Sequence, residues 1–383
     1  MVNHLNKTIL PGQTIGIIGG GQLGQMMALS AKEKGFKVGV LDPSEDCPAS
    51  QVSDWHIIAN YDDSKAIETL ANQSDILTYE FENVDATVLA PYEVQGKLPQ
   101  GLTLLKITQN RQLEKEFLSK HQIPIAPFEI IHSKEELNHA LETIGFPSVL
   151  KTIVGGYDGK GQVVLHTDKE IKEAAQLLNS NICILEKWVP FEKEVSVIIS
   201  NNLKGEISVF PLAENSHEDN ILFTSVAPAR VSDTCRDNAV ALAKTINKEL
   251  NACGTIAIEM FVTKDEDILV NEIAPRPHNS GHYTIEACSF SQFDTHILGI
   301  TQWCMPDVEQ FSPAIMVNLI GDEQTRAKQA VTEKKDWYFH FYGKKVEKPG
   351  RKMGHITILS NSVLDTLEDI QQDNIWQKRG INK

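Results

Sequence analysis

Residues 14–42, TIGIIGGGQLGQMMALSAKEKGFKVGVLD, decide the fold class of this chain. An apolar run at 14–18 is followed by a glycine-rich loop, a helical pattern at 22–34 and a second apolar run at 37–41. A strand, a helix and a strand in this order predict a parallel α/β sheet. Because WHIIAN, a helical stretch at 63–72 and DILTYEF continue the pattern, we expect one parallel sheet in the first hundred residues.

The glycine-rich motif of this stretch, GGGQLG at 19–24, opens the first helix. Asp42 ends the second strand about twenty residues later, which is the spacing of a dinucleotide-binding fingerprint. The glycines would let a pyrophosphate approach the N-terminus of the helix. A tight turn without a ligand explains the same residues, so the motif alone leaves both interpretations open.

Length and pattern divide the chain into three parts. At roughly 150 residues per domain, 383 residues suggest two or three domains. We expect an N-terminal Rossmann-like domain over 1–107 and a central α/β domain over 108–313. The central domain carries a compact lid over about 124–190, and a small, β-rich C-terminal domain follows over 314–383.

Three local predictions concern the central part. A helix is expected to begin at TQNRQLEKEFLSKH with Thr108 as its N-cap. A second helix is expected from Asp168 to Leu178. The segment AENSHEDN at 213–220 is interpreted as a polar loop.

The composition is that of an ordinary globular protein, with 41% hydrophobic and 23% charged residues. Its net charge of −15 argues against broad binding to nucleic acid or anionic membranes, so an anionic ligand requires a local basic patch. No run approaches the roughly 18 apolar residues of a membrane span, and the beginning, MVNHLNKTILPGQ, lacks the pattern of a signal peptide. We therefore expect a cytoplasmic protein whose six scattered cysteines are reduced thiols.

Two glutamates form the most informative pair. Glu259 and Glu272 lie in the apolar runs IAIEMFV and ILVNEIA, which a polar turn at 263–267 connects. In an antiparallel hairpin centred on this turn they face each other with Cβ atoms about 5 Å apart, and like charges at this distance are destabilising. A divalent cation removes the conflict, and carboxylate oxygens suit Mg²⁺. The alternative is an acidic pair that faces solvent.

A second glycine-rich loop, GGYDGKG at 155–161, follows a strand that carries Lys151. Four glycines in seven residues are entropically costly unless their N–H groups serve a purpose, such as folding over a polyphosphate. The spacing differs from that of a Walker loop. The loop therefore predicts a polyphosphate site, with a hairpin tip without a ligand as the alternative.

The stretch NEIAPRPHNSGH at 271–282 leaves the second acidic strand. It places Arg276 near the expected metal, where a guanidinium stabilises charge on a transferred phosphoryl group or an acyl phosphate. His278 and His282 have the four-residue spacing of zinc ligands, but Pro277 disfavours the helix that such a pair needs. We therefore interpret the stretch as part of a phosphoryl-transfer site.

Two further features suggest a ligand. Basic residues crowd YGKKVEKPGRKMGH at 342–355 and form either a solvated turn or a site for the phosphate of a small substrate. Glu80 and Glu82 follow a strand of the first sheet, at the edge where open α/β sheets bind ligands, and are expected on one face. One of them would bind an amine or sugar hydroxyls, unless it only caps the strand end.

Together these motifs resemble the ATP-grasp superfamily and, within it, the family of N5-carboxyaminoimidazole ribonucleotide synthetases, over essentially the whole chain. GGGQLG, YEFENV, QNR, GGYDGKGQ, EKWVPFEKEVSV, AIEMF, NEIAPRPHNSGH and YGK followed by GRKMGH occur in the family's order. The resemblance implies a central ATP-grasp fold and the ATP- and bicarbonate-dependent carboxylation of 5-aminoimidazole ribonucleotide, through carboxyphosphate, in purine biosynthesis. It also implies Mg²⁺, a homodimer and no NAD at the first glycine loop.

The resemblance also implies roles for individual residues. For ATP it implies Arg111, Lys151, Gly156, Tyr157, Asp158, Gly159, Lys160, Gly161, Gln162, Glu186, Lys187, Trp188, Val189, Glu194, His217, Asn271 and Glu272. The residues for Mg²⁺ are Glu259 and Glu272. For the ribonucleotide it implies Gln22, Leu23, Glu80 and Tyr157, and for its phosphate Lys344, Arg351 and Lys352. The catalytic residues would be Arg276, His278, Asp158 and Lys151.

Two positions qualify the resemblance. Many ATP-grasp enzymes have Asn two positions after the second glutamate, where this chain has Ala274, as the synthetase subgroup does. Asn220 stands in a turn where Gly is expected, and Asn tolerates the left-handed region. The alternatives to a synthetase are another ATP-grasp ligase that activates formate or an amino acid, an ATP sensor without turnover, and an NAD-dependent oxidoreductase.

Overall fold

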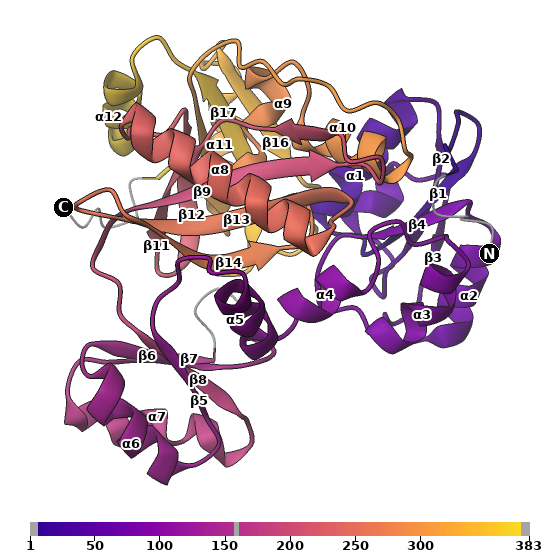
Figure 1. Ribbon diagram of the computed structural model, residues 1–383. Helices are drawn as coiled ribbons and strands as arrows, with labels where there is room; N and C mark the ends of the chain where they lie inside the picture. Colours follow the sequence, from indigo (N-terminus) through magenta and orange to yellow (C-terminus); the bar gives the residue numbers. More distant parts are fainter. Residues whose placement is uncertain (1–6, 157–160, 377–383) are drawn as a thin grey trace.

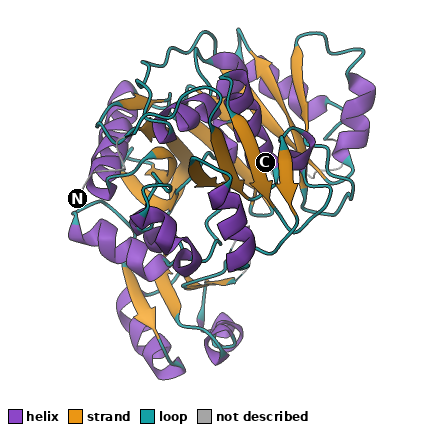
Figure 2. Ribbon diagram, turned by 90° about the vertical axis from the view of Figure 1, so that its right-hand side faces the viewer, coloured by secondary structure: helices purple, strands orange, loops and turns teal. Residues whose placement is uncertain are grey.

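The computed structural model describes residues 7–156 and 161–376 of the chain. Their strands form a four-stranded sheet in the N-terminal part, a nine-stranded sheet in the centre and a four-stranded sheet in the lid. The lid forms a lobe of its own below the central sheet in Figure 1 and keeps this place after the quarter turn of Figure 2. None of the helices in the described ranges is long and apolar enough to cross a membrane.

The N-terminal sheet is parallel in every pair and has the order β3-β2-β1-β4, which confirms the prediction of a parallel α/β sheet. Its apolar side chains pack on both faces, as the near-continuous apolar runs of its strands require. The elements are β1 (Thr14–Ile18), α1 (Gln22–Glu33), β2 (Lys37–Leu41), β3 (Trp55–Ile57), α2 (Ser64–Asn72), β4 (Ile76–Tyr79) and α3 (Ala86–Val94).

Two helices and the lid follow this sheet. The lid sheet is antiparallel, with the order β5-β8-β6-β7, and α6 packs on it through Leu137, Leu141 and Ile144. The elements are α4 (Thr103–Thr108), α5 (Arg111–Lys120), β5 (Phe128–Ile131), α6 (Lys134–Ile144), β6 (Ser148–Thr152), β7 (Gln162–Leu165), α7 (Ile171–Ala174) and β8 (Cys183–Lys187).

The central sheet has the order β14-β13-β9-β11-β12-β15-β17-β16, and β10 pairs with β9. Its last three strands come from the C-terminal part of the chain, so the β-rich C-terminal segment extends this sheet. The strands are β9 (Phe191–Asn201), β10 (Ile207–Val209), β11 (Ala213–Glu218), β12 (Ile221–Ala227), β13 (Gly254–Thr263), β14 (Ile268–Ala274), β15 (Ala314–Ile320), β16 (Trp337–Phe341) and β17 (Lys352–Leu359). The helices are α8 (Asp233–Leu250), α9 (Thr284–Ala287), α10 (Gln292–Ile300), α11 (Glu323–Ala330) and α12 (Val363–Gln372).

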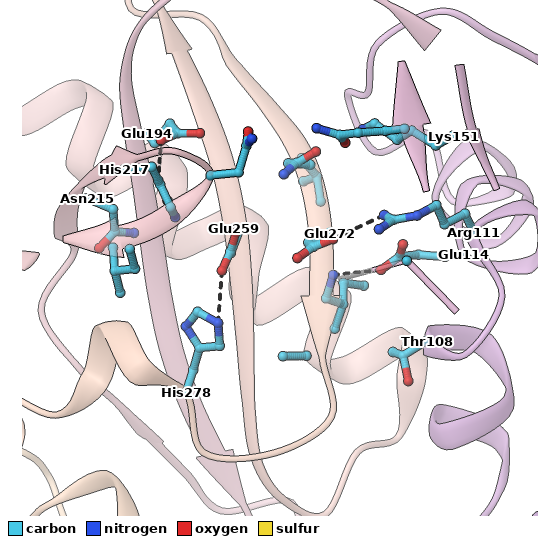
Figure 3. A pocket seen from close by; sticks show the side chains of 18 of the residues that line it. Thr108, Arg111, Glu114, Lys151, Glu194, Asn215, His217, Glu259, Glu272 and His278 are labelled. Carbon is cyan, nitrogen blue, oxygen red and sulfur yellow. Dashed lines mark hydrogen bonds and ion pairs between the residues drawn. The ribbon is translucent and has the colours of Figure 1, made fainter. Parts of the chain in front are cut away.

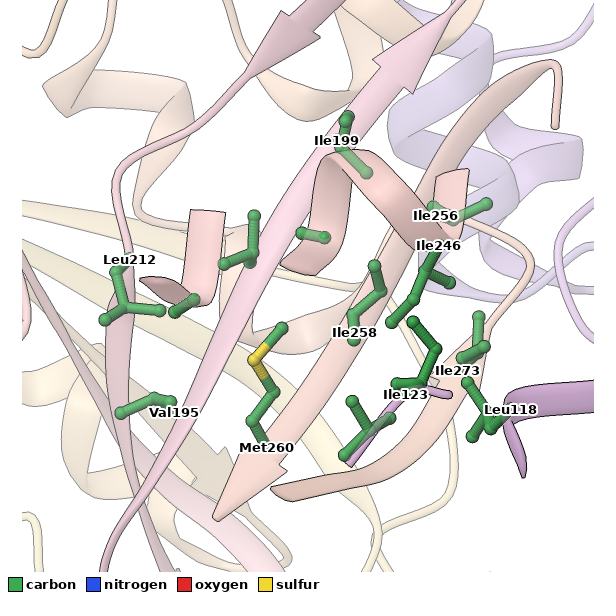
Figure 4. Close-up of a cluster of buried hydrophobic side chains, with 14 of the residues drawn as sticks. Leu118, Ile123, Val195, Ile199, Leu212, Ile246, Ile256, Ile258, Met260 and Ile273 are labelled. Atoms are coloured by element: carbon green, nitrogen blue, oxygen red, sulfur yellow. The ribbon is translucent and has the colours of Figure 1, made fainter. Parts of the chain in front are cut away.

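The core of the central sheet lies between its strands and α8. Ile256, Ile258 and Met260 alternate along β13 and point to the same side, where they belong to one cluster with Ile246 of α8 (Figure 4). Because side chains of a strand alternate between its faces, Glu259 must point to the opposite face. The apolar face of the hairpin therefore anchors the sheet and leaves its acidic face for a ligand.

Of two predicted helices, the first is present as α5 but begins later than expected, and the second was wrong. Thr108 ends α4 instead of capping the next helix; Asn110 caps α5, because its side-chain oxygen accepts the backbone N–H groups of Gln112 and Leu113. The helix expected over 168–178 is broken into two single 3₁₀ turns and the short α7. Ala174 is buried, and Ile171, Leu177 and Leu178 pack against the lid core, so the three pieces keep the apolar contacts of the expected helix without its continuous backbone.

The polar segment AENSHEDN was wrongly expected to be a loop. Its residues form β11, which pairs with β9 and β12, and a turn at Asp219 and Asn220. Both turn residues have positive φ, 49° and 61°, so Asn220 adopts the left-handed conformation that Asn tolerates.

Candidate active site

A cavity of about 980 Å³ lies where the N-terminal part, the central sheet and the lid meet. Figure 3 shows Glu259 and Glu272 on neighbouring strands, between Glu194 on one side and Lys151 on the other. Of the residues that the resemblance implies, the cavity is lined by Gln22, Leu23, Glu80, Arg111, Lys151, Gly156, Gln162, Glu186, Lys187, Trp188, Val189, Glu194, His217, Glu259, Asn271, Glu272, Arg276, His278 and Lys352. Those outside the lining are Gly161, Lys344 and Arg351. Those outside the described residues are Tyr157, Asp158, Gly159 and Lys160.

Glu259 on β13 and Glu272 on β14 are register partners, as predicted. Closer to the turn, however, Met260 pairs with Val270. If the two strands kept this register, Glu259 would face Asn271 instead of Glu272. A β-bulge shifts the pairing by one residue between these positions. Because a bulge sets two residues of one strand against one of the other, Asn271 and Glu272 both line the cavity beside Glu259.

Each of the two carboxylates has a nitrogen-bearing partner in the cavity. His278 Nε2 lies 2.9 Å from Glu259 Oε1, and Arg111 Nη1 lies 3.1 Å from Glu272 Oε2. Burial alone would raise the pKa of Glu259, but His278 outweighs this effect and holds the pKa below its usual value. The like charges are thus balanced by side chains that belong to the same cavity.

The donors around this pair suit a hard cation. In the described ranges, no group of three or more His, Cys, Asp and Glu side chains is arranged to hold a metal. The adjacent carboxylates of Glu259 and Glu272 offer oxygen donors only, and Mg²⁺ is commonly held by one or two carboxylates together with the phosphates of a ligand. The residues therefore fit Mg²⁺ that arrives with a nucleotide.

Helix α5 brings two residues that the sequence analysis missed. Arg111, Glu114, Lys115 and Leu118 share one helix face, and Glu114 and Lys115 are each only 2% exposed. Burial raises the pKa of Glu114 to about 8, although Lys115 partly opposes the shift. The signal that could have identified them is helical spacing: Glu114 and Lys115 precede Leu118 by four and three residues and therefore share its helix face.

The lid contributes a lysine and an aromatic edge. Lys151 Nζ forms an ion pair with Glu186, whose other carboxylate oxygen lies 2.9 Å from Lys115 Nζ. Burial opposes ionisation of Glu186, but the two lysines lower its pKa. Beyond it, Trp188 lines the cavity with Phe191, which stacks on another ring at 4.7 Å. This edge offers the apolar surface that a planar base needs.

The opposite wall of the cavity comes from β9 and β11. His217 Nδ1 lies 2.5 Å from Glu194 Oε2. Burial would lower the pKa of His217, but Glu194 outweighs this effect and raises it. Asn215, also missed by the sequence analysis, donates to Ser196 and accepts from Ser225. A wall made of such polar side chains explains why β11 lacks the apolar alternation of a strand.

The lid loop is described on both sides of a gap. Gly155 and Gly161 have positive φ, 76° and 74°, and Gly161 accepts the backbone N–H of Thr152. The glycines at these two positions are therefore explained by backbone conformation. Gly156 and Gln162, which stand on either side of the gap, both line the cavity.

The first glycine loop binds side chains of the protein itself. Gly21 N and Gly24 N donate to the two carboxylate oxygens of Glu80, at 2.6 and 2.5 Å, and Gly20 N donates to Asp42 at 2.8 Å. A Cβ atom on Gly21 would lie 2.6 Å from a Glu80 oxygen. The glycines thus serve a close approach of Glu80, and this geometry favours the structural interpretation of the motif over a pyrophosphate site.

The expectation that Glu80 and Glu82 share one strand face was wrong, because β4 ends at Tyr79. Glu80 turns to α1, whereas Glu82 binds Arg276, with Oε2 2.7 Å from Nε. Burial opposes ionisation of Glu82, but Arg276 lowers its pKa to about 2. Arg276 is thereby fixed across the junction between the N-terminal part and the central sheet.

The basic segment divides into two groups. Lys344 Nζ donates to the carbonyl of Lys352 at 2.8 Å. Burial lowers the pKa of Lys344 to about 8; the charges of Arg351 and Lys352 add to this shift and that of Glu80 opposes it. Lys352 lines the cavity together with Glu80, which follows β4, so Lys344 and Lys352 lie at this end of the cavity. Lys345 instead forms an exposed ion pair with Asp46.

The two histidines of the polar stretch have different surroundings. His278 lines the cavity, whereas His282 is fully buried, with Nδ1 3.1 Å from Gln292 Nε2. Its ring centroid lies 4.7 Å from that of His355. Burial lowers the pKa of His282 well below its usual value.

Comparison with known proteins adds three family matches. The models are the Ribonucleotide synthetase preATP-grasp domain over 12–109, the ATP-grasp domain over 116–293 and the Phosphoribosylaminoimidazole carboxylase C-terminal domain over 314–369. Together they extend over most of the chain.

Similar proteins agree with these matches. The N5-carboxyaminoimidazole ribonucleotide synthase of Bacillus subtilis (strain 168) is 47% identical over 97% of this chain and 98% of its own. A solved ADP complex of an N5-carboxyaminoimidazole ribonucleotide synthetase matches with a TM-score of 0.95 and 49% identity, over 97% of this chain and 98% of its own. The Aspergillus clavatus synthase, solved with ADP and 5-aminoimidazole ribonucleotide, matches with a TM-score of 0.88 and 34% identity, over 96% and 97%.

Proposed function

This chain belongs to the family of N5-carboxyaminoimidazole ribonucleotide synthases, and from this premise we propose how the residues of its cavity carry out the family's reaction. The protein is an ATP-dependent carbon–nitrogen ligase that carboxylates the exocyclic amine of 5-aminoimidazole ribonucleotide in purine biosynthesis. One observation carries the assignment of residues: a single cavity joins Glu259 and Glu272 to Glu80 and Lys352.

In the first step, bicarbonate attacks the γ-phosphorus of ATP. A new oxygen–phosphorus bond forms, the bond to the β-phosphate oxygen breaks, and the products are carboxyphosphate and ADP. Lys151 and Arg276 neutralise charge on the transferred group, and His278 binds the bicarbonate. The adenine lies against Trp188 and the ribose at Glu194. Most of the rate comes from positioning and electrostatics.

In the second step, carboxyphosphate breaks down to CO₂ and phosphate, and the exocyclic amine attacks the carbon of CO₂. The amine loses one proton to the phosphate released in the same step and becomes the N5-carbamate. The ribonucleotide lies near Gln22, Leu23 and Glu80. Its phosphate is bound by Lys344, Arg351 and Lys352. A closed cavity that excludes water protects carboxyphosphate from hydrolysis. Tyr157 is proposed to contact the ribonucleotide and Asp158 to be catalytic, both on the family resemblance alone.

Mg²⁺ is the cofactor of the proposed reaction, and Glu259 and Glu272 would hold it. When bound, it would offset the negative charge of the nucleotide phosphates. His278 and Arg111, which balance these carboxylates in the structure, would then be available to the anionic substrates.

The proposed function is tested by ADP release in a coupled assay with Mg-ATP and bicarbonate. We expect strong stimulation when aminoimidazole ribonucleotide is added, because its amine completes the second step. Stimulation must also require bicarbonate. Turnover that is indifferent to the ribonucleotide would assign the chain to an ATP-grasp ligase with another substrate.

Replacement of Lys344 by Gln tests the phosphate site. Loss of one charge-assisted contact is expected to raise the KM for the ribonucleotide about tenfold and to leave kcat nearly unchanged. Lys345→Gln is the matched control, because Lys345 is exposed and paired with Asp46. An equal rise of KM in both variants would contradict a specific role of Lys344.

The pH dependence gives a second readout of the same site. Lys344 has a pKa of about 8, so it loses its positive charge as the pH rises through this value. In the wild type, kcat/KM for the ribonucleotide is therefore expected to fall above pH 8. In Lys344→Gln this alkaline decline should be absent.

Three further points complete the proposal. The parts over 1–107, 108–313 and 314–383 are proposed as the domains of the enzyme. A homodimer is proposed because the family resemblance implies it, and a cytoplasmic location is proposed because it suits an enzyme of purine biosynthesis. Light scattering of the purified protein measures the first of these two, and a monomer at assay concentration would refute it.

A further inference from the structure

The nucleotide side of the cavity depends on an edge strand. β14 lies at the end of the nine-stranded sheet, with β13 as its partner strand, and on its outer side an isolated bridge joins Val270 to Ile125. The bulge interrupts this ladder at the residues that line the cavity, Asn271 and Glu272. Because a bulge leaves its extra residue unpaired, β13 alone does not determine the conformation of this short stretch.

Two side chains of α5 bind the backbone on either side of Glu272. Lys115 Nζ donates to the carbonyl of Asn271 at 2.8 Å, and Glu114 Oε1 accepts the N–H of Ile273 at 2.6 Å. Figure 3 shows Glu114 beside this strand, next to Arg111. The two side chains thus supply hydrogen bonds that a neighbouring strand would otherwise supply.

The burial of the Glu114 and Lys115 side chains costs free energy of folding and therefore needs an explanation. Glu114 and Lys115 are each 2% exposed and share a helix face with the buried Leu118. Placing ionisable groups in such a site is unfavourable without partners, and apolar residues are the usual choice on a buried face. The partners found here are the backbone of the bulge and Glu186, 2.9 Å from Lys115.

We propose that Glu114 and Lys115 are positioning residues that clamp the bulge of β14 and thereby aim Asn271 and Glu272 into the cavity. Lys115 also connects this clamp to the lid, because Glu186 binds both Lys115 and Lys151. The inference rests on the proposed function, in which Glu272 serves Mg²⁺ and the nucleotide.

Nucleotide binding, rather than turnover, tests the clamp. The dissociation constant of ADP is measured calorimetrically with and without Mg²⁺ on the full chain, and the ratio of the two constants is the readout. The enhancement of ADP binding by Mg²⁺ is expected to be about tenfold lower in Glu114→Leu and in Lys115→Met. Loss of a residue that orients a metal ligand typically weakens metal binding by about this factor. Glu114→Gln keeps an acceptor oxygen and is expected to stay within about twofold of the wild type.

Two controls make the outcome specific. Glu116 lies on the same helix but is exposed. In Glu116→Gln the ratio of the two ADP dissociation constants should therefore equal that of the wild type. Glu272→Ala should abolish the enhancement. If Glu272→Ala retains it, the proposed metal site is refuted. If Glu272→Ala abolishes it while Glu114→Leu and Lys115→Met keep the wild-type ratio, the clamp is refuted and the metal site stands.

A measurement without any substitution guards against variants that do not fold. Backbone amide exchange of the wild type is expected to show slow exchange of the Ile273 N–H, because Glu114 holds it although it lies on an edge strand. In Glu114→Leu this amide should exchange at least about tenfold faster. Wild-type exchange at the rate of an exposed amide would overturn the inference by itself.

Discussion

Glu272→Ala is expected to reduce ribonucleotide-stimulated ADP release by about 10³-fold, which corresponds to about 4 kcal/mol of transition-state stabilisation. The carboxylate is one of the two proposed Mg²⁺ ligands, and its loss also frees Arg111 from its ion pair at 3.1 Å. Steady-state assays over a range of Mg²⁺ concentrations measure the effect. The apparent Mg²⁺ requirement should rise along with the loss of rate.

The variant should nevertheless fold. The Glu272 side chain is 41% exposed, so its ion pair contributes at most about 1 kcal/mol, and its removal also relieves repulsion by Glu259. Urea unfolding is expected to give a free energy within about 1 kcal/mol of the wild type. The matched control is Glu173→Ala on the exposed surface of the lid, which should leave both rate and stability unchanged. A Glu272→Ala enzyme with near-normal turnover would refute the assignment of this carboxylate.

The parallel first sheet could be predicted because its signals are local. Strand–helix–strand order and the glycine loop lie within thirty or so residues, and alternation of apolar runs needs no knowledge of distant contacts. The pairing of Glu259 with Glu272 was also predicted correctly. It holds because a bulge adds one residue to β14 between Val270 and Glu272, a feature that the polar turn residues do not specify.

The predictions for β11 and for the start of α5 were wrong because both depend on segments that are distant in the sequence. β11 was expected to be a loop because it is polar, but its polar side chains line a cavity, so apolar alternation is not required there. Thr108 and Asn110 are both acceptable caps, and only the path of the chain after α4 decides between them. Local sequence does not contain this information.

The sequence predicted which kinds of residues form the site, but only some of the contacts between them. The partner of Arg276 is Glu82, 194 residues away in the sequence, and Glu80 binds the backbone of a loop 56 to 59 residues before it. Such contacts depend on how the N-terminal part meets the central sheet. Glu114 and Lys115 are different: their place on the buried face of α5 is visible in the sequence once the helix is set in register with Leu118.

Arg276→Gln is expected to lower the rate of ADP release by about 10³-fold, because an arginine beside a transferred phosphoryl group typically contributes at least this much. The nucleotide affinity should change little, since the charge is needed mainly in the transition state. Single-turnover measurements separate the two quantities. Arg236→Gln, at a partly exposed position on α8, is the matched control.

The same substitution also affects stability, because it leaves Glu82 without its cation. The paired Glu82 has a pKa of about 2, below its usual value, so the pair stabilises the protein above about pH 4.5 and loses this effect as the pH falls towards 2. At neutral pH, Arg276→Gln is therefore expected to cost about 2 kcal/mol.

The double variant Glu82→Gln with Arg276→Gln separates the two roles of the arginine. It contains no unpaired charge, so urea unfolding should return most of the lost stability, whereas turnover should remain about 10³-fold low. Recovery of turnover together with stability would mean that Arg276 acts only by holding the N-terminal part against the central sheet. Persistent loss of turnover in a stable double variant would place the guanidinium at the reacting group, because a contact that only joins two parts of the fold is dispensable once its charges are removed together.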